Sequence, residues 1–397
     1  MRDLGPVVLG PNQPQRFYRG GQKIAAFRAG AGPEAGPQGQ DPARARSVDT
    51  PRAGPGGQPP APARSVDTPP ADPDADPQGA GRDGGHRPED WVGSATTVFG
   101  SQTDGLTRLP DGRLLRDAIG ADPEAYLGPG HVRRHGSSPA LLVKLLDAGE
   151  RLPVHCHPDD VFARRHLASP WGKTEAWIVI DAAPGSEVHL GFSEVVPDET
   201  LAGWVGGQDP AMLRALNRVA VRPGDAILVP AGLPHAIGSG VFVVELQEPT
   251  DLSVLLEWDA FPIDGRAQGH LGLGFDLALN CVDRSAWKPS QIARLHGPAG
   301  AAAGRPVTTV FSPEADPYFA AERIRPGPGT VMLDPGFAIL IVIAGSGLLR
   351  GEQGDDVPLR RGMTVLIPHG AGQTEITGHC ELIRCLPPSA APADVAP

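Results

Sequence analysis

The sequence is short of several residue types, and each shortage excludes a class of protein. Only 4 of its 397 residues are cysteine, which excludes a disulfide-stapled scaffold and favours reduced thiols in a cytoplasm. Lysine and arginine number 35 against 46 aspartate and glutamate, so the formal net charge of −11 leaves no basic surplus for coating nucleic acid. The longest wholly apolar run, Phe337–Ala344, is far shorter than the roughly 20 residues of a membrane helix. We therefore expect a cytoplasmic protein that binds neither nucleic acid nor a membrane.

Large apolar residues are also missing from one long internal segment. Residues 30–87 contain no aromatic residue and no Leu, Ile or Met, and they repeat the run Ala-Arg-Ser-Val-Asp-Thr-Pro at 45–51 and 63–69. Such a segment cannot bury enough apolar surface to offset the entropy lost when a chain becomes ordered. The composition therefore predicts a disordered Pro/Gly/Ala-rich insertion.

The rest of the chain alternates short β-prone runs with glycine and proline turns, and 40% of the sequence is hydrophobic. This pattern is typical of sandwiches and barrels, and predicts a mainly β protein of two barrels with a few short helices. The expected parts are N-terminal strands joining the first barrel (1–29), a metal-binding domain (88–262), a helical connector (263–302), a second β domain without metal (303–390) and a frayed tail (391–397).

Two histidine motifs carry the chemistry. The first, Gly149-x5-His155-x-His157, places two imidazoles on one face of a strand because side chains alternate between its faces. The second, Gly224-x5-Pro230-x-Gly232-x2-His235, adds a third imidazole after a glycine turn, a strand and a second turn. Between the two motifs, Glu175 opens another strand. Three imidazoles and one carboxylate suit Zn²⁺, with Mn, Fe, Co and Ni not excluded by ligand type.

A single His-x-His pair is more often two surface or hydrogen-bonded histidines, but the two motifs together form the two-part signature of the cupin barrel, a jelly roll. The surrounding runs resemble the shorter bacterial form of type I mannose-6-phosphate isomerases in their order and spacing. These runs are Leu141–Ala148, His155–Asp160, Gly172–Trp177 and Pro234–Gly238, with further similarity at Arg19–Ile24, at Glu89–Ser94 and in the C-terminal domain. The resemblance therefore covers nearly the whole chain except the insertion.

The resemblance implies an enzyme that interconverts mannose 6-phosphate and fructose 6-phosphate, an aldose and a ketose. In that reaction a divalent metal stabilises an enediolate while a base moves a proton between neighbouring carbons. The metal ligands carried over from the family, with Zn²⁺ or another divalent ion as cofactor, are His155, His157, Glu175 and His235. The first of these positions is usually Gln in the family, so this site is richer in imidazole.

Three further residues match functional positions of the family. Glu245 matches a carboxylate on the strand after the last histidine, and Lys144 and Lys173 match pocket lysines. A purely structural interpretation stays open for two of them: Lys173 can simply pair with a nearby acid, and Glu245 can orient a ligand histidine.

The sequence departs from the family at one position. Thr250-Asp-Leu-Ser-Val-Leu255 keeps the family's Asp but has Leu255 where the resemblance implies an arginine, and leucine cannot bind phosphate as a guanidinium does. Arg266, on a nearby glycine-rich loop, is a candidate replacement cation, although it can equally be a solvated loop residue. In the C-terminal domain Gly362-x5-Pro368-x-Gly370 is intact, but Gln373 replaces the histidine, which indicates a barrel without a metal.

Three functions are compatible with these residues. Retention of Lys144, Lys173, Glu175 and Glu245 favours the isomerase, acting as a monomer or dimer on a small phosphosugar. Leu255 favours a non-catalytic or regulatory sugar-binding metal cupin. The third possibility is a different metal-dependent cupin enzyme, such as an oxygenase that uses Fe.

Overall fold

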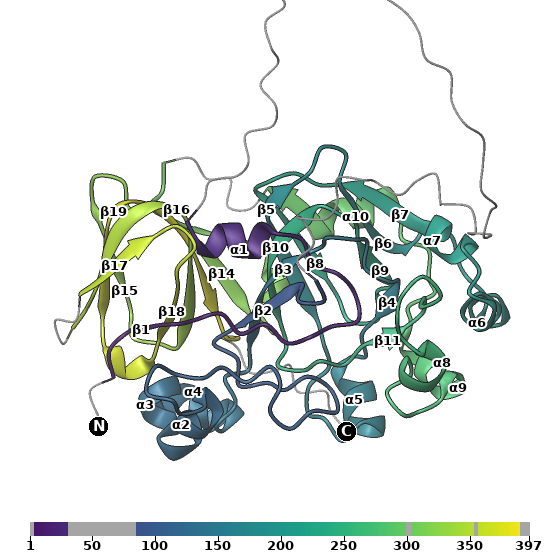
Figure 1. Ribbon diagram of the computed structural model, residues 1–397, viewed down its shortest axis with the longest axis horizontal. Helices are drawn as coiled ribbons and strands as arrows, with labels where there is room; N and C mark the ends of the chain where they lie inside the picture. The colour runs from purple at the N-terminus through teal and green to yellow at the C-terminus, as the bar shows by residue number, and fades with distance from the viewer. Residues whose placement is uncertain (1–3, 31–84, 299–303, 353–355, 390–397) are drawn as a thin grey trace, which may run out of the picture. The chain divides into compact units, whose positions relative to one another are not determined.

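The computed structural model describes residues 4–30, 85–298, 304–352 and 356–389 (Figure 1). The predicted insertion lies outside these residues apart from residue 30 and residues 85–87, and the predicted tail at 391–397 lies wholly outside them. Within the described ranges no helix has the length and apolar character that crossing a membrane requires.

The prediction of a mainly β fold is confirmed by three antiparallel sheets. The eight-stranded sheet contains β1 (Val7–Val8), β13 (Val307–Thr309), β14 (Ala320–Ile324), β15 (Thr330–Leu333), β16 (Ala338–Gly351), β17 (Asp356–Arg360), β18 (Thr364–Ile367) and β19 (Thr374–Leu386). The six-stranded sheet contains β2 (Glu89–Val92), β3 (Leu142–Asp147), β5 (Glu175–Ala182), β8 (Asp225–Val229), β10 (Val241–Gln247) and β12 (His296–Pro298). The five-stranded sheet contains β4 (His155–Cys156), β6 (Glu187–Phe192), β7 (Leu216–Ala220), β9 (His235–Ile237) and β11 (Val254–Leu255).

The helices are short. They are α1 (Lys23–Arg28), α2 (Leu115–Ala121), α3 (Pro123–Leu127), α4 (Pro129–His135), α5 (Asp160–His166), α6 (Asp198–Gly207), α7 (Ala211–Ala215), α8 (Gly265–Gln268), α9 (Phe275–Ala278) and α10 (Pro289–Leu295), with 3-10 turns η1 (Leu279–Cys281), η2 (Pro313–Ala315) and η3 (His369–Ala371). The expected helical connector contains α8, α9, η1 and α10, and it ends in β12, which pairs with β8.

Strands β3, β8 and β10 of the six-stranded sheet are buried along their whole length, which explains why their residues are mostly apolar. On β10, Val243 belongs to a core shared with residues of the five-stranded sheet such as Leu190. Its neighbour Val244 belongs to a second core that includes Phe319 and Ile339 of the C-terminal region. The segments predicted as two separate barrels therefore share a core, whereas a third cluster, with Leu340 and Leu382, fills the inside of the C-terminal sheet.

The N-terminal segment differs from the expectation that its strands join the first barrel. Strand β1 pairs with β18 of the C-terminal sheet, and the purple N-terminal strand lies beside the yellow strands in Figure 1. Residues 23–28, within the segment expected to contain strands, form α1. A two-residue strand carries too little pattern to specify its partner, and Ile24 and Phe27 of α1 are spaced to bury one helical face.

Glycines allow the N-terminal segment to lie against the end of β3. Gly20 forms an isolated bridge with Ala148, and a Cβ on Gly149 would lie 2.4 Å from the carbonyl carbon of Gly20. The Gly20 amide donates to the carbonyl of Gly85 and the Arg16 amide donates to that of His86, each at 2.9 Å. Residues 85 and 86 therefore already contact the folded part, slightly ahead of the predicted domain start at residue 88.

Alanine at this crossing should destabilise the protein. We expect Gly149→Ala to lower the free energy of unfolding by about 1–3 kcal/mol, because the new Cβ overlaps backbone that cannot rotate away. Gly120→Ala in α2 is the control, since its Cβ has no neighbour within 4 Å, and it should be neutral or raise stability by up to about 1 kcal/mol. Urea unfolding of both variants measures the difference, and equal midpoints would show that the crossing is not tightly packed.

Candidate active site

Three imidazoles meet between the five-stranded and six-stranded sheets. His155 on β4 pairs directly with His235 on β9, and His157 follows two residues after His155. Cys156 belongs to the core on the other side of the five-stranded sheet, as the alternation of strand side chains requires. The ring centroids lie 4.3–5.0 Å apart, and one nitrogen of each ring lies within 4.8 Å of the others.

Backbone carbonyls fix the orientation of all three rings. The Nδ1 atoms of His155, His157 and His235 lie 2.8, 2.8 and 2.7 Å from the carbonyl oxygens of Pro153, Leu252 and Leu233. Because a carbonyl only accepts, each Nδ1 carries the proton and each Nε2 keeps its lone pair. The buried Nε2 of His235 has no hydrogen-bond partner among the described residues. Three Nε2 lone pairs directed at one centre are what a metal ion requires.

Burial keeps two of the imidazoles, those of His155 and His157, in the neutral form that binds metal. It lowers the pKa of His155 well below its usual value, and it lowers the pKa of His157 to about 3, where Lys173 adds to the effect. Neither ring is therefore protonated at neutral pH.

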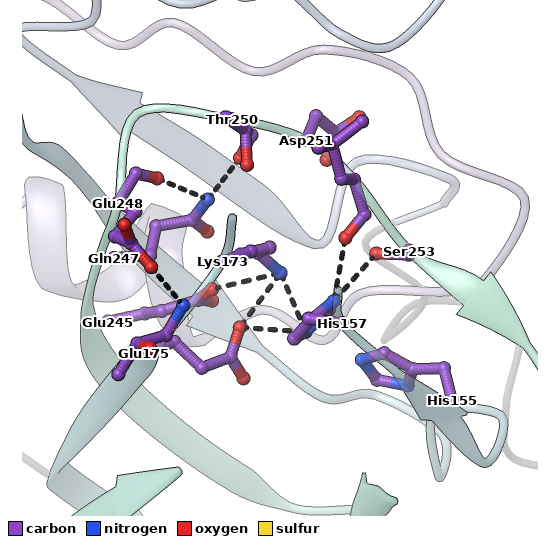
Figure 2. Close-up of polar contacts among 12 residues, drawn as sticks. His155, His157, Lys173, Glu175, Glu245, Gln247, Glu248, Thr250, Asp251 and Ser253 are labelled. Carbon is purple, nitrogen blue, oxygen red and sulfur yellow. Dashed lines mark hydrogen bonds and ion pairs between the residues drawn. The ribbon is translucent and has the colours of Figure 1, made fainter. Parts of the chain in front are cut away.

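Glu175 brings a carboxylate to the imidazoles from the first position of β5. Its Oε2 lies 3.0 Å from Nε2 of His157 (Figure 2). Its Oε1 lies 3.3 Å from Nε2 of His235. Burial alone would raise the pKa of Glu175, but Lys173 and His157 hold it well below the usual range. All four residues predicted as metal ligands thus lie together, and the donor set fits a divalent ion such as Zn²⁺.

A cavity beside the imidazoles is lined by Arg16, Glu89, Lys144, Lys173, Glu175 and Glu245, among other residues. These charged side chains, together with Asp251, which pairs with Arg16, alternate in sign. Their order, from the N-terminal segment to the imidazoles, is Asp251, Arg16, Glu89, Lys144, Glu245, Lys173 and Glu175, with closest N–O distances of 2.9, 3.6, 3.5, 3.5, 3.8 and 2.8 Å between neighbours. Four carboxylates face three cations, and the series ends beside the histidines. A cation bound by the imidazoles would supply the charge that the series lacks.

The two predicted lysines and the predicted base occupy the middle of this series. Lys173 Nζ lies 2.8 Å from Glu175 and 3.0 Å from Nε2 of His157 (Figure 2). Lys144 pairs with both Glu89 and Glu245 and lies 5.0 Å from the ring centre of Trp91. The pKa of Glu245 is raised to about 7, chiefly because burial outweighs the opposing effect of Lys144.

The predicted cation Arg266 does not line the cavity. It is exposed on α8, where its guanidinium donates to the carbonyl of Gly206 at 2.9 Å. Leu255 does line the cavity and pairs with His155 across β11 and β4.

Arg16 brings a guanidinium to the same cavity, and sequence reasoning missed it together with its partners Glu89 and Asp251. Arg16 and Lys144 overcome the effect of burial and lower the pKa of Glu89 to about 2. Arg16 stands four residues before the glycine pair at 20 and 21, but nothing in its spacing marks it as a cavity residue.

Glu248 fixes the backbone between the Lys173 and Glu175 side chains, and sequence reasoning missed it as well. Its Oε2 accepts the Thr174 amide at 2.7 Å, and its own amide donates to the Thr174 carbonyl at 3.1 Å. Burial, reinforced by Asp160, raises the pKa of Glu248 to about 8.

Known proteins similar to this chain are mannose-6-phosphate isomerases. Residues 313–387 match the family model "Mannose-6-phosphate isomerase, cupin domain". The mannose-6-phosphate isomerase ManA of Bacillus subtilis (strain 168) is 30% identical over 249 residues, which cover 61% of this chain and 73% of that protein. The mannose-6-phosphate isomerase of Streptococcus mutans serotype c is 29% identical over 246 residues, which cover 61% and 72%.

Solved structures show the same fold. The crystal structure of the mannose 6-phosphate isomerase from Bacillus subtilis superposes with a TM-score of 0.66 at 22% sequence identity. The match covers 96% of this chain and 99% of that chain.

The raised pKa of Glu248 should make stability fall as the pH rises. A carboxyl group that is a weaker acid when folded contributes stability below its unfolded pKa, and this contribution is lost as the pH rises through about 8. Glu248→Gln should therefore flatten the decline in the free energy of unfolding between about pH 5 and about pH 9. Denaturant unfolding across this range is the measurement, with exposed Glu194→Gln as the control. A Glu248→Gln slope as steep as that of the wild type would contradict the assignment.

Proposed function

The chain belongs to the mannose-6-phosphate isomerase family, and from this premise we propose that it interconverts mannose 6-phosphate and fructose 6-phosphate with a bound divalent metal. The proposal rests on the three Nε2 atoms directed at one centre beside the Glu245–Lys173 pair. The proposed ligands are His155, His157, Glu175 and His235, and Zn²⁺ fits their chemistry. A divalent ion held there would stabilise negative charge on the sugar oxygens.

Glu245 is the proposed base. The reaction removes a proton from the carbon beside a carbonyl and returns it to the neighbouring carbon. A carboxyl group whose pKa is about 7 suits both steps, because it accepts and releases a proton near neutral pH. Its place in the middle of β10, between the paired strands β3 and β5, holds the carboxylate rigidly.

The two lysines have positioning and charge-balancing roles in this proposal. Lys144 lies 3.5 Å from Glu245 on the adjacent strand, where its charge limits the rise in the carboxyl pKa. Lys173 lies between Glu245 and Glu175, so it balances both carboxylates and directs its ammonium toward the same space as His157.

A second function, sugar binding without turnover, is favoured by one observation. Leu255 presents an isobutyl group to the cavity at the position where the family resemblance implies an arginine. A cavity that lacked a phosphate-binding group would hold a dianionic sugar weakly.

Removing a proposed ligand should remove the metal. Each of His157→Ala and His235→Ala takes one of four donors away, so bound Zn²⁺ should fall from one per chain to well below one, and isomerase activity should fall with it. His189→Ala is the matched control, because His189 lies on β6 of the same sheet and pairs with Ala236 rather than with the cluster. Elemental analysis of the purified proteins decides the outcome. Full metal content in both ligand variants would place the ion elsewhere.

Removing the base should abolish turnover without removing metal. We expect metal-loaded wild-type protein to convert mannose 6-phosphate to fructose 6-phosphate, and Glu245→Gln to lower kcat by about 10²- to 10⁴-fold. Glu187→Gln is the control, because Glu187 pairs with Arg218 outside the cavity. A coupled assay for fructose 6-phosphate measures the rates. If the fully metallated wild type showed no turnover, sugar binding alone would be the better explanation.

A further inference from the structure

The cavity contains a guanidinium although Leu255 replaces the expected arginine. Arg16 comes from the N-terminal segment and lines the same cavity as Leu255, Lys173 and Glu245. The backbone of this segment is held in place by the hydrogen bond from the Arg16 amide to His86 and by the close crossing of Gly20 over Gly149. Arg16 is therefore fixed at the cavity by contacts that do not involve its side chain.

The guanidinium of Arg16 is held by Asp251 through some of its N–H groups, and its other N–H groups are unused by the described residues. Its two terminal nitrogens donate to the two carboxylate oxygens of Asp251 at 2.9 and 3.2 Å. Its buried Nε lies 3.6 Å from Glu89 and makes no hydrogen bond to a described residue. A guanidinium has five N–H groups, so the fork on Asp251 leaves donors for a further acceptor.

The other two cations of the cavity are less accessible. The Lys144 side chain is 2% exposed and the Lys173 side chain 5% exposed, whereas that of Arg16 is 13% exposed. Each lysine contacts two carboxylates, as Arg16 does, and Lys173 also contacts a ring of the imidazole cluster. An incoming anion therefore meets Arg16 as the accessible cation of this cavity.

Asp251 is the residue that binds Arg16, and it lies close in sequence to Leu255, where the family resemblance implies an arginine. It stands four residues before Leu255, and the resemblance to the family extends to this aspartate but stops at Leu255. In this chain Asp251 accepts hydrogen bonds from the guanidinium of Arg16, which is 235 positions away in the sequence.

We propose that Arg16 is a specificity-determining residue that contacts the phosphate of the sugar substrate and takes the place of an arginine at position 255. This inference rests on the proposed function and names the group that distinguishes a phosphosugar from a free sugar. The N–H donors that the fork on Asp251 leaves over can pair with phosphate oxygens, a geometry that a lysine ammonium does not offer.

The test is binding of glucitol 6-phosphate, a polyol phosphate that has no carbonyl to isomerise, to the Zn²⁺-loaded protein by calorimetry. Arg16→Gln should weaken its affinity by about 10- to 100-fold, the loss expected for one or more charge-assisted hydrogen bonds. Arg16→Lys keeps the charge but not the fork and should recover only part of the affinity. Arg266→Ala, which removes an exposed arginine outside the cavity, should bind like the wild type.

A double variant separates contact with phosphate from simple neutralisation of Asp251. Arg16→Gln leaves the Asp251 carboxylate unpaired, which can repel an anion or destabilise the fold, whereas Arg16→Gln with Asp251→Asn removes both charges. If Arg16 contacts the phosphate, the double variant should still bind glucitol 6-phosphate about 10-fold or more weakly than the wild type. Wild-type affinity in the double variant would overturn the proposal, because Arg16 would then only mask Asp251.

The two proposals fail in different ways. A metallated wild type that neither binds glucitol 6-phosphate nor converts mannose 6-phosphate would overturn the proposed function itself. A wild type that does both, with Arg16→Gln and the double variant retaining wild-type affinity, would overturn the role of Arg16 alone. Turnover of mannose 6-phosphate that falls through KM rather than kcat in Arg16→Lys would support a binding contact remote from the reacting carbons.

Discussion

Contact between opposite charges allows seven ionisable side chains to lie in and around one cavity. An isolated ion in a protein interior costs several kcal/mol, so each of these groups depends on the neighbour that balances it. The series runs without a break from Asp251 to Glu175, and it joins the N-terminal segment, β2, β3, β10 and β5. The pKa of Glu245 and the pKa of Glu89 are therefore properties of the whole series, which makes the candidate site one electrostatic unit.

The six-stranded sheet provides the rigid surface on which that unit is built. Along β10, Val243, Glu245 and Gln247 share one face, so Glu245 is flanked on that face by Val243 and Gln247. The residues between them point to the opposite face and are apolar. That opposite face packs on residues of the C-terminal region, including Phe319 and Ile339. The C-terminal region therefore packs against the face of β10 that lies opposite Glu245. The interior of the C-terminal sheet is filled by apolar side chains.

The sequence was most informative where the determining features are local. The spacing around His155 and His157 predicted that two imidazoles would share one face of a strand, and the second motif added His235 as the third, because alternation along a strand and a glycine turn act over a few residues. The mainly β fold followed from the same kind of pattern. Arg16 and Asp251 could not be paired in this way, since their contact depends on how two loop segments 235 residues apart are brought together. For the same reason, the short distance in sequence between Arg266 and Leu255 did not predict which arginine lines the cavity.

The N-terminal segment has a consequence for the order in which the protein can mature during synthesis. Leu9 accepts a hydrogen bond from Thr364, 355 residues later, and Arg16 needs an aspartate that is translated more than two hundred residues after it. The residues made first are thus among the last to reach their final neighbours, a high contact order that slows folding. A ribosome-bound chain that has emerged only as far as β10 would contain the three histidines and Glu175, but neither Asp251, which pairs with Arg16, nor Leu252, whose carbonyl orients the His157 ring. The guanidinium and the imidazole cluster therefore both depend on the short segment that follows β10.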